Sequence, residues 1–219
     1  DAQDVGQPVQ FRLVVRRVVD AEQQTEVFGN IFIALGVAGL LMYVSGHLPA
    51  TGERIELSAS TLANWAAKTA NMVRDEFALE PGGKVAVLLP AHWQRVAVLL
   101  GVWWAGGEVV LSPDADAELA FVTADRLDDV ADVPEVAALS VDAFGKGLSD
   151  LPLGVADYAT SIRVHGDQFR SAGAGSALEG RSVADTIDAA RASAKNVELV
   201  STDRVLSSRT WDTADELID

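Results

Sequence analysis

The sequence predicts an α/β fold in which a layered, mainly parallel sheet is flanked by helices. Three observations predict it. The run KVAVLL at 84–89 is almost continuously apolar, as expected of a strand buried on both faces of a parallel sheet. Apolar residues recur at helical spacing before and after this run. Further along the chain, short apolar runs alternate with helical segments, a pattern typical of βαβ crossovers.

The first 49 residues are expected to form an N-terminal extension, followed by one α/β domain at 50–219. The alternating run at 9–15 indicates an edge strand or a mobile arm. The uncharged segment at 27–44 is barely long enough for a membrane-spanning helix, which takes about 17–25 apolar residues. We expect a buried helix and then a core strand there. The alternative is a hydrophobic anchor that tethers the domain to a membrane.

The domain is expected to open with a short strand at 54–57 and a helix at 58–79. Ser58 can cap this helix, because a serine hydroxyl accepts hydrogen bonds from N–H groups of the first turn. Pro81 and the two glycines after it end the helix in a turn.

A second helix is expected at 92–105, after the strand at 84–89. It is apolar almost all round, which favours a position between two layers, and Gly106 and Gly107 end it. Further strands are predicted at 108–111, 119–123, 135–141 and 203–207, and a further helix at 182–195.

Two longer stretches share the same order of predicted elements. Residues 58–89 and 182–207 both read as a capped helix, a turn and an apolar strand, which indicates an internal structural repeat. The region 145–176 is rich in Gly, Ser, Asp and Ala and is predicted to be a linker or irregular surface.

Composition excludes several functions. The net charge of −15 argues against a nucleic-acid partner, which would need clustered Lys and Arg. The chain has no cysteine, so it has no disulfide, no thiol nucleophile and no cysteine-based metal site. These features fit a cytoplasmic protein.

Residues 56–116 resemble the opening of the AMP-binding, adenylate-forming (acyl-CoA synthetase-like) superfamily. Residues 182–206 are similar to its later helix and D-R-V-L strand. The resemblance covers 50–219, is closest to an uncharacterised, truncated actinobacterial group, and implies the fold of the N-terminal part of acyl-CoA synthetases. The matching residues of the first stretch are Ser58, Pro81, Gly82, Val85, Ala86, Pro90, Trp93, Ala105, Gly106 and Pro113.

The resemblance places a phosphate-binding loop at 171–179. In the superfamily, a loop rich in Ser, Thr and Gly, with a Lys, holds the ATP phosphates. The candidate cofactor-binding residues here are Ser171, Gly173, Gly175 and Ser176. The loop is degenerate, because Ala174 and Gly175 replace threonines and Glu179 stands at the basic position. The alternative is a flexible surface linker.

The chain is therefore not expected to be a self-sufficient ligase, and it also ends before the superfamily's C-terminal subdomain with its catalytic Lys. We expect a non-catalytic relic or interaction module with a protein partner or a second copy of itself, and with no catalytic residue, cofactor or metal. One alternative is a nucleotide- or acyl-binding component completed by another polypeptide. Another is a membrane-tethered accessory domain.

The remaining polar candidates favour structural roles. Asp114, Asp116 and Glu118 indicate a solvated acidic loop rather than a cation site, because a Ca²⁺ loop needs more oxygen ligands. His165 and Asp167 could form an acid–base pair, although no nucleophile is recognisable nearby. The three histidines lack the spacing of a zinc site. The adjacent Trp103 and Trp104 are expected in the core, with an interface as the alternative.

Overall fold

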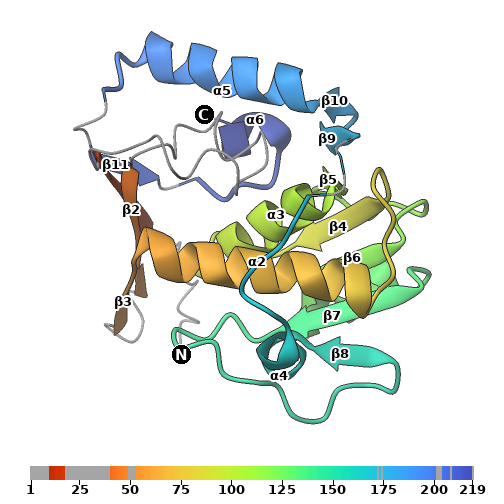
Figure 1. Cartoon of the computed structure of the whole chain (residues 1–219). Helices are drawn as coiled ribbons and strands as arrows, with labels where there is room; N and C mark the ends of the chain where they lie inside the picture. Colours follow the sequence, from red (N-terminus) through yellow and green to blue (C-terminus); the bar gives the residue numbers. More distant parts are fainter. Residues whose placement is uncertain are drawn as a thin grey trace, which may run out of the picture.

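The structure is a computed structural model that describes residues 10–17, 40–48, 53–171, 173, 175–200, 204–207 and 209–218. Its strands form two sheets, and the helices α2 (Ala59–Asp75) and α3 (Trp93–Ala105) cross the middle of the molecule (Figure 1). The other helical segments are the 3₁₀ helices η1 (Ala124–Val130) and η2 (Ile162–Val164), and the helices α4 (Tyr158–Ser161), α5 (Val183–Asn196) and α6 (Ala214–Ile218).

The larger sheet has seven strands in the order β10-β9-β5-β4-β6-β7-β8. All neighbours are parallel except the β9–β10 hairpin, so the predicted α/β fold with a mainly parallel sheet is confirmed. The strands are β4 (Lys84–Leu88), β5 (Glu108–Val110), β6 (Leu119–Thr123), β7 (Glu135–Leu139), β8 (Val155–Asp157), β9 (Ser176–Leu178) and β10 (Arg181–Ser182).

Both faces of this sheet are covered, which explains the continuous apolar run of β4. Successive side chains of a strand point to opposite faces. Val85 and Val87 join the core cluster that α2 and α3 complete, whereas Ala86 and Leu88 join a second cluster with Val130 of η1. A strand between two cores has no position for a charged residue.

The predicted cap of α2 is present, and α3 has a cap that was not predicted. The Ser58 hydroxyl accepts a hydrogen bond from the Thr61 N–H at 3.1 Å, and the His92 Nδ1 accepts one from the Gln94 N–H at 3.2 Å. Gly106 ends α3 with a φ of 88°, a conformation that costs glycine little. Helix α2 stops at Asp75, before the predicted position 79.

The smaller sheet is antiparallel, in the order β11-β1-β2-β3. Its strands are β1 (Gln10–Arg17), β2 (Leu40–Leu48), β3 (Glu53–Leu57) and β11 (Arg204–Ser207). The prediction of an edge strand or mobile arm at 9–15 is wrong, because β1 pairs with a strand on each side. The strand predicted at 203–207 belongs to this sheet and not to the parallel one, because its partner is β1.

The extension predicted at 1–49 thus contributes two strands that pair with strands of the segment 50–219. Of the apolar segment 27–44, residues 27–39 lie outside the described residues, and residue 40 begins β2. Among the helices that the structure describes, none combines the length and apolar character needed to cross a bilayer.

One prediction about a longer stretch is wrong, and another holds only in part, because 145–154 and 165–171 are irregular. Helix α2 leads from the antiparallel sheet into the parallel one, whereas α5 leads from the parallel sheet into the antiparallel one, so 58–89 and 182–207 are not a structural repeat. The predicted linker 145–176 contains β8 and α4, and Tyr158 and Ile162 there are fully buried. Its polar composition reflects tight turns around a few core side chains.

Candidate functional site

The glycine-rich loop lies at the edge of the parallel sheet where the strands begin. Ser171, Gly173 and Gly175 are exposed, and Ser176 starts β9, which runs parallel to β5. A Cβ atom on Gly175 would lie 3.2 Å from the Cα atom of Gly82, just before β4. Ligands of open α/β sheets bind outside the carboxyl ends of the strands, at the opposite edge.

The surroundings of the loop disfavour an anion. A Cβ atom on Gly106 would lie 2.5 Å from the Gly173 carbonyl oxygen, so the loop runs against the C-terminal end of α3. That end of a helix carries a partial negative charge, whereas phosphate sites use the N-terminal end. The Ser171 hydroxyl accepts a long hydrogen bond, 3.4 Å, from the Gly173 N–H. Ala174 lies outside the described residues.

Glu179 does not face the loop, which corrects the expectation that its charge would meet a bound phosphate. The three residues of β9 separate it from Gly175, about 10 Å of extended chain. Glu179 and Gly180 have φ values of 48° and 76°, the signs that a type I′ hairpin turn requires. The Glu179 Oε1 accepts a hydrogen bond from the Leu111 N–H at 2.7 Å. Its carboxylate therefore joins the hairpin to the end of β5.

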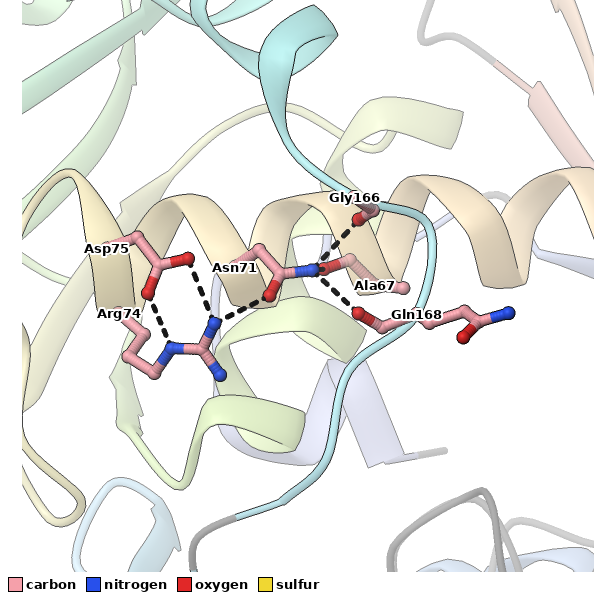
Figure 2. Close-up of polar contacts among 6 residues, drawn as sticks. All are labelled: Ala67, Asn71, Arg74, Asp75, Gly166 and Gln168. Atoms are coloured by element: carbon pink, nitrogen blue, oxygen red, sulfur yellow. Dashed lines mark hydrogen bonds and ion pairs between the residues drawn. The ribbon is translucent and has the colours of Figure 1, made fainter.

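The segment before the loop is fastened along α2, as Figure 2 shows. The Asn71 side-chain amide donates to the carbonyl oxygens of Gly166 (2.8 Å) and Gln168 (2.9 Å), and its oxygen accepts from Arg74 (2.9 Å). The Arg74 guanidinium also lies 4.7 Å from the centre of the buried Phe169 ring. These contacts fix the chain up to residue 169.

The proposed acid–base pair of His165 and Asp167 is not formed. The His165 Nε2 instead lies 2.9 Å from a carboxylate oxygen of Glu76, and the Lys68 ammonium donates to the His165 carbonyl. Both partners belong to or follow α2, so His165 fastens the same segment to that helix.

A lysine pairs with two carboxylates of the acidic loop after β5. The Lys84 ammonium lies 3.1 Å from Asp114 and 3.7 Å from Asp116. The Asp116 N–H and then Lys84 stabilise the Asp114 carboxylate by hydrogen bonds, which lowers the pKa of Asp114. No group of three or more His, Asp or Glu among the described residues could hold a metal ion.

The two adjacent tryptophans have structural contacts. The Trp103 indole N–H donates to the Ala177 carbonyl at 2.7 Å, which ties α3 to β9. Trp104 is buried and packs edge-to-face on Phe169, with 5.9 Å between ring centres. Core packing is therefore confirmed for Trp104, and Trp103 is partly buried against the same core.

A polar group that the sequence analysis did not identify lies at the carboxyl edge, where α3 begins. His92, Gln94 and Arg95 are almost completely buried. Neither end of the Gln94 amide has a hydrogen-bond partner in the described part of the chain, and the same holds for the Arg95 Nε. The signal was in the sequence: three polar residues open an otherwise apolar helix immediately after a buried strand.

Arg95 reaches back past the start of its helix. Its guanidinium donates to the carbonyl oxygens of Leu89, Thr210 (3.3 Å) and Trp211. Burial lowers the pKa of Arg95 to about 10, and the charges of Asp212 and Glu216 partly offset this effect. A buried cation thus connects the end of β4 with residues close to α6.

Burial also lowers the pKa of His92 to about 4, although the nearby Asp142 opposes the shift. An unfolded His titrates near 6.5, so between pH 6.5 and 4 the unfolded chain binds the extra proton. The free energy of unfolding is therefore expected to decrease as the pH is lowered from 6.5 to 4, by up to about 3 kcal/mol from His92 alone. Denaturant unfolding at pH 7 and pH 4.5 should show a smaller loss for His92→Asn, because Asn keeps a capping oxygen without the titration. Equal losses in both proteins would contradict this assignment.

No protein-family model matches the chain. A "TIGR03089 family protein" of Mycobacterium tuberculosis is 53% identical over 178 residues, which cover 78% of this chain and 73% of that protein. Apo MatB from Rhodopseudomonas palustris aligns with a TM-score of 0.50 at 14% identity, covering 68% of this chain and 34% of MatB.

Two further solved structures are similar to the chain. The anthranilate CoA ligase AuaEII in complex with anthranoyl-AMP has a TM-score of 0.49 at 13% identity, over 71% of this chain and 32% of the ligase. The Brucella canis acyl-CoA synthetase has a TM-score of 0.49 at 24% identity, over 58% and 26%. The chain spans about a third or less of each solved protein, and it shares the fold of the N-terminal part of MatB.

Proposed function

The chain belongs to the TIGR03089 family, and from this premise we propose that it is an acyl-CoA synthetase-like domain that acts through protein contacts and does not activate carboxylic acids with ATP. The observation that carries the proposal is the position of the glycine-rich loop. It lies at the edge where the strands begin and against the C-terminal end of α3. Neither location favours a phosphate group.

The chemistry of adenylation supports this interpretation of the geometry. The reaction needs donors and a cation where negative charge develops on the phosphates. Losing one such donor costs on the order of 3 kcal/mol, and here both threonine hydroxyls and the basic side chain of the superfamily's loop are missing. The net charge of −15 further disfavours a nucleotide.

A role in protein contacts is supported by the segment that follows α5. The structure gives α5 no buried residue, and Val197, Leu199 and Val200 beyond it expose 69%, 41% and 58% of their surface. Apolar side chains gathered in one exposed segment favour a protein partner or a second copy of the chain. Sedimentation across a range of concentrations tests self-association directly.

The protein is expected to show no acid-dependent exchange of pyrophosphate with ATP across a panel of carboxylic acids. An intact acyl-CoA synthetase serves as the positive control. The variant Glu179→Lys should remain inactive as well, because β9 separates this position from the loop. Exchange by the unmodified chain would overturn the proposal. Micromolar ATP binding without exchange would instead favour a nucleotide-binding component that another polypeptide completes.

A further inference from the structure

We propose that the carboxyl edge of the parallel sheet holds a binding site for a small oxyanion, a phosphate or carboxylate group, at Arg95, and that residues 209–218 close it. We call residues 209–218 the cover segment. The site is separate from the glycine-rich loop, and its ligand is an anion rather than ATP.

The location is where an open α/β sheet binds ligands. The chain leaves β4 through α3 toward β5, and it leaves β6 through η1 toward β7, on the other side of β4. The strand order therefore reverses between β4 and β6. The crevice at the carboxyl ends of two such strands is the usual ligand position. Leu89, whose carbonyl accepts from Arg95, is the residue that follows β4.

The Arg95 guanidinium is only partly used by the protein. Its Nη2 donates to the Trp211 carbonyl, whereas the neighbouring Nε has no partner among the described residues, although Arg95 is only 1% exposed. Nε and Nη2 together form the side of the guanidinium that binds two oxygens of a carboxylate or phosphate. A single carbonyl oxygen from the cover segment now occupies half of that pair.

The surrounding groups also favour an anion. The N-terminal end of α3, a helix of 13 residues, points its partial positive charge to this edge. The buried Gln94 in the first turn has an amide without partners. Arg126 is close enough to lower the pKa of Arg95, whereas Asp212 and Glu216 of the cover segment raise it. Opening the segment would move the negative charges of Asp212 and Glu216 away from Arg95, while Arg126 stays paired with Asp129 at 2.9 Å.

The cover segment is held by partial burial, because Trp211, Ala214, Leu217 and Ile218 pack against the core without being fully buried. Trp211 has a φ of 64°, a left-handed conformation that is strained for a bulky residue. Helix α6 has no buried residue, and its ion pair between Asp215 and Arg181 is exposed. Glu216 accepts from the Thr210 hydroxyl and the Asp212 N–H, both at 3.0 Å, so the segment forms a capped turn of its own. Detaching this unit would break its partial contacts with the core but no strand pairing.

Calorimetric titration of the full chain with inorganic phosphate and, separately, with acetate tests the proposal. Arg95→Lys keeps the positive charge but loses the bidentate hydrogen-bond donor, so the affinity for the anion is expected to fall at least about tenfold. Glu216→Ala loosens the cover segment, so binding is expected to tighten about three- to tenfold. The exposed Arg163 provides the matched control, and Arg163→Lys should bind like the unmodified chain. Circular dichroism verifies that each variant is folded.

Hydrogen exchange supplies the second measurement. The bound anion is expected to speed exchange in residues 209–218 and not in α3. Binding of phosphate alone or acetate alone identifies the ligand's group, and binding of both supports a general oxyanion site, provided that Arg95→Lys weakens it. The proposal is overturned if neither anion binds the unmodified chain or Glu216→Ala at concentrations up to about 50 mM, well above the millimolar range of weak ligands. It is also overturned if Arg95→Lys binds normally.

Discussion

Phe121→Ala is expected to lower the free energy of unfolding by about 4 kcal/mol, enough to unfold a marginally stable domain. Phe121 is completely buried in β6. Its ring meets Phe77 and Tyr158 edge-to-face, with ring centres 6.4 and 6.0 Å apart. The substitution removes the apolar contact area and leaves a cavity between the sheet and α2. Urea unfolding followed by circular dichroism measures the loss.

Phe144→Ala is the matched control, since this ring is 68% exposed and should change the free energy of unfolding by less than about 0.5 kcal/mol. Phe121→Leu should fall between the two, because leucine refills part of the cavity. If Phe121→Ala and Phe144→Ala unfold at the same urea concentration, the position of β6 in the core is wrong.

Gly101→Ala is expected to destabilise the protein by about 2 kcal/mol, although alanine favours helices over glycine by about 1 kcal/mol. A Cβ atom on Gly101 would lie 2.4 Å from the Thr69 Cβ atom and 2.9 Å from the Ala66 carbonyl oxygen. Thr69 cannot turn away, because its hydroxyl is hydrogen-bonded to Trp65 (2.8 Å) and Tyr158 (2.7 Å). Helices α2 and α3 must therefore move apart.

Gly166→Ala provides the comparison in the same unfolding experiment. The nearest atom to its added Cβ would be the Asn71 amide nitrogen, at 3.8 Å, an ordinary contact distance. Its free energy of unfolding should stay within about 0.5 kcal/mol of the unmodified protein. A stable Gly101→Ala variant would show that the two helices do not cross at this glycine.

The strands and the two α-helices between 53 and 139 could be predicted from sequence because local patterns specify them, whereas η1 was not predicted. Ser58, Gly106 and the apolar strand β4 act through neighbouring backbone groups or through the alternation of faces. Strand β11 shows the limit of such patterns. Its residues read as another βαβ strand, yet they pair with β1, nearly two hundred residues earlier. Strand pairing across that distance leaves no local signal in the sequence.

The candidate loop shows the same limit at the level of a site. The loss of threonines and of the basic residue could be read from positions 174, 175 and 179. The sequence could not show at which edge of the sheet the loop lies. It also could not show that β9 separates Glu179 from the loop. The β9–β10 hairpin was not predicted either, because glutamate, here Glu179, is uncommon at turn positions with a positive φ.

The sequence by itself determined the layered α/β fold, the start of α2 at Ser58, the end of α3 at Gly106 and the degenerate loop, because each depends on residues close together in the chain. Only the tertiary structure decided that Arg95, Leu89 and Trp211 meet at the carboxyl edge. Arg95 lies in an apolar helix, and Trp211 lies far along the chain in a polar segment. Their contact depends on how the sheet and the cover segment pack. A buried cation must be hydrogen-bonded, and the packing decides which carbonyl oxygens are within its reach.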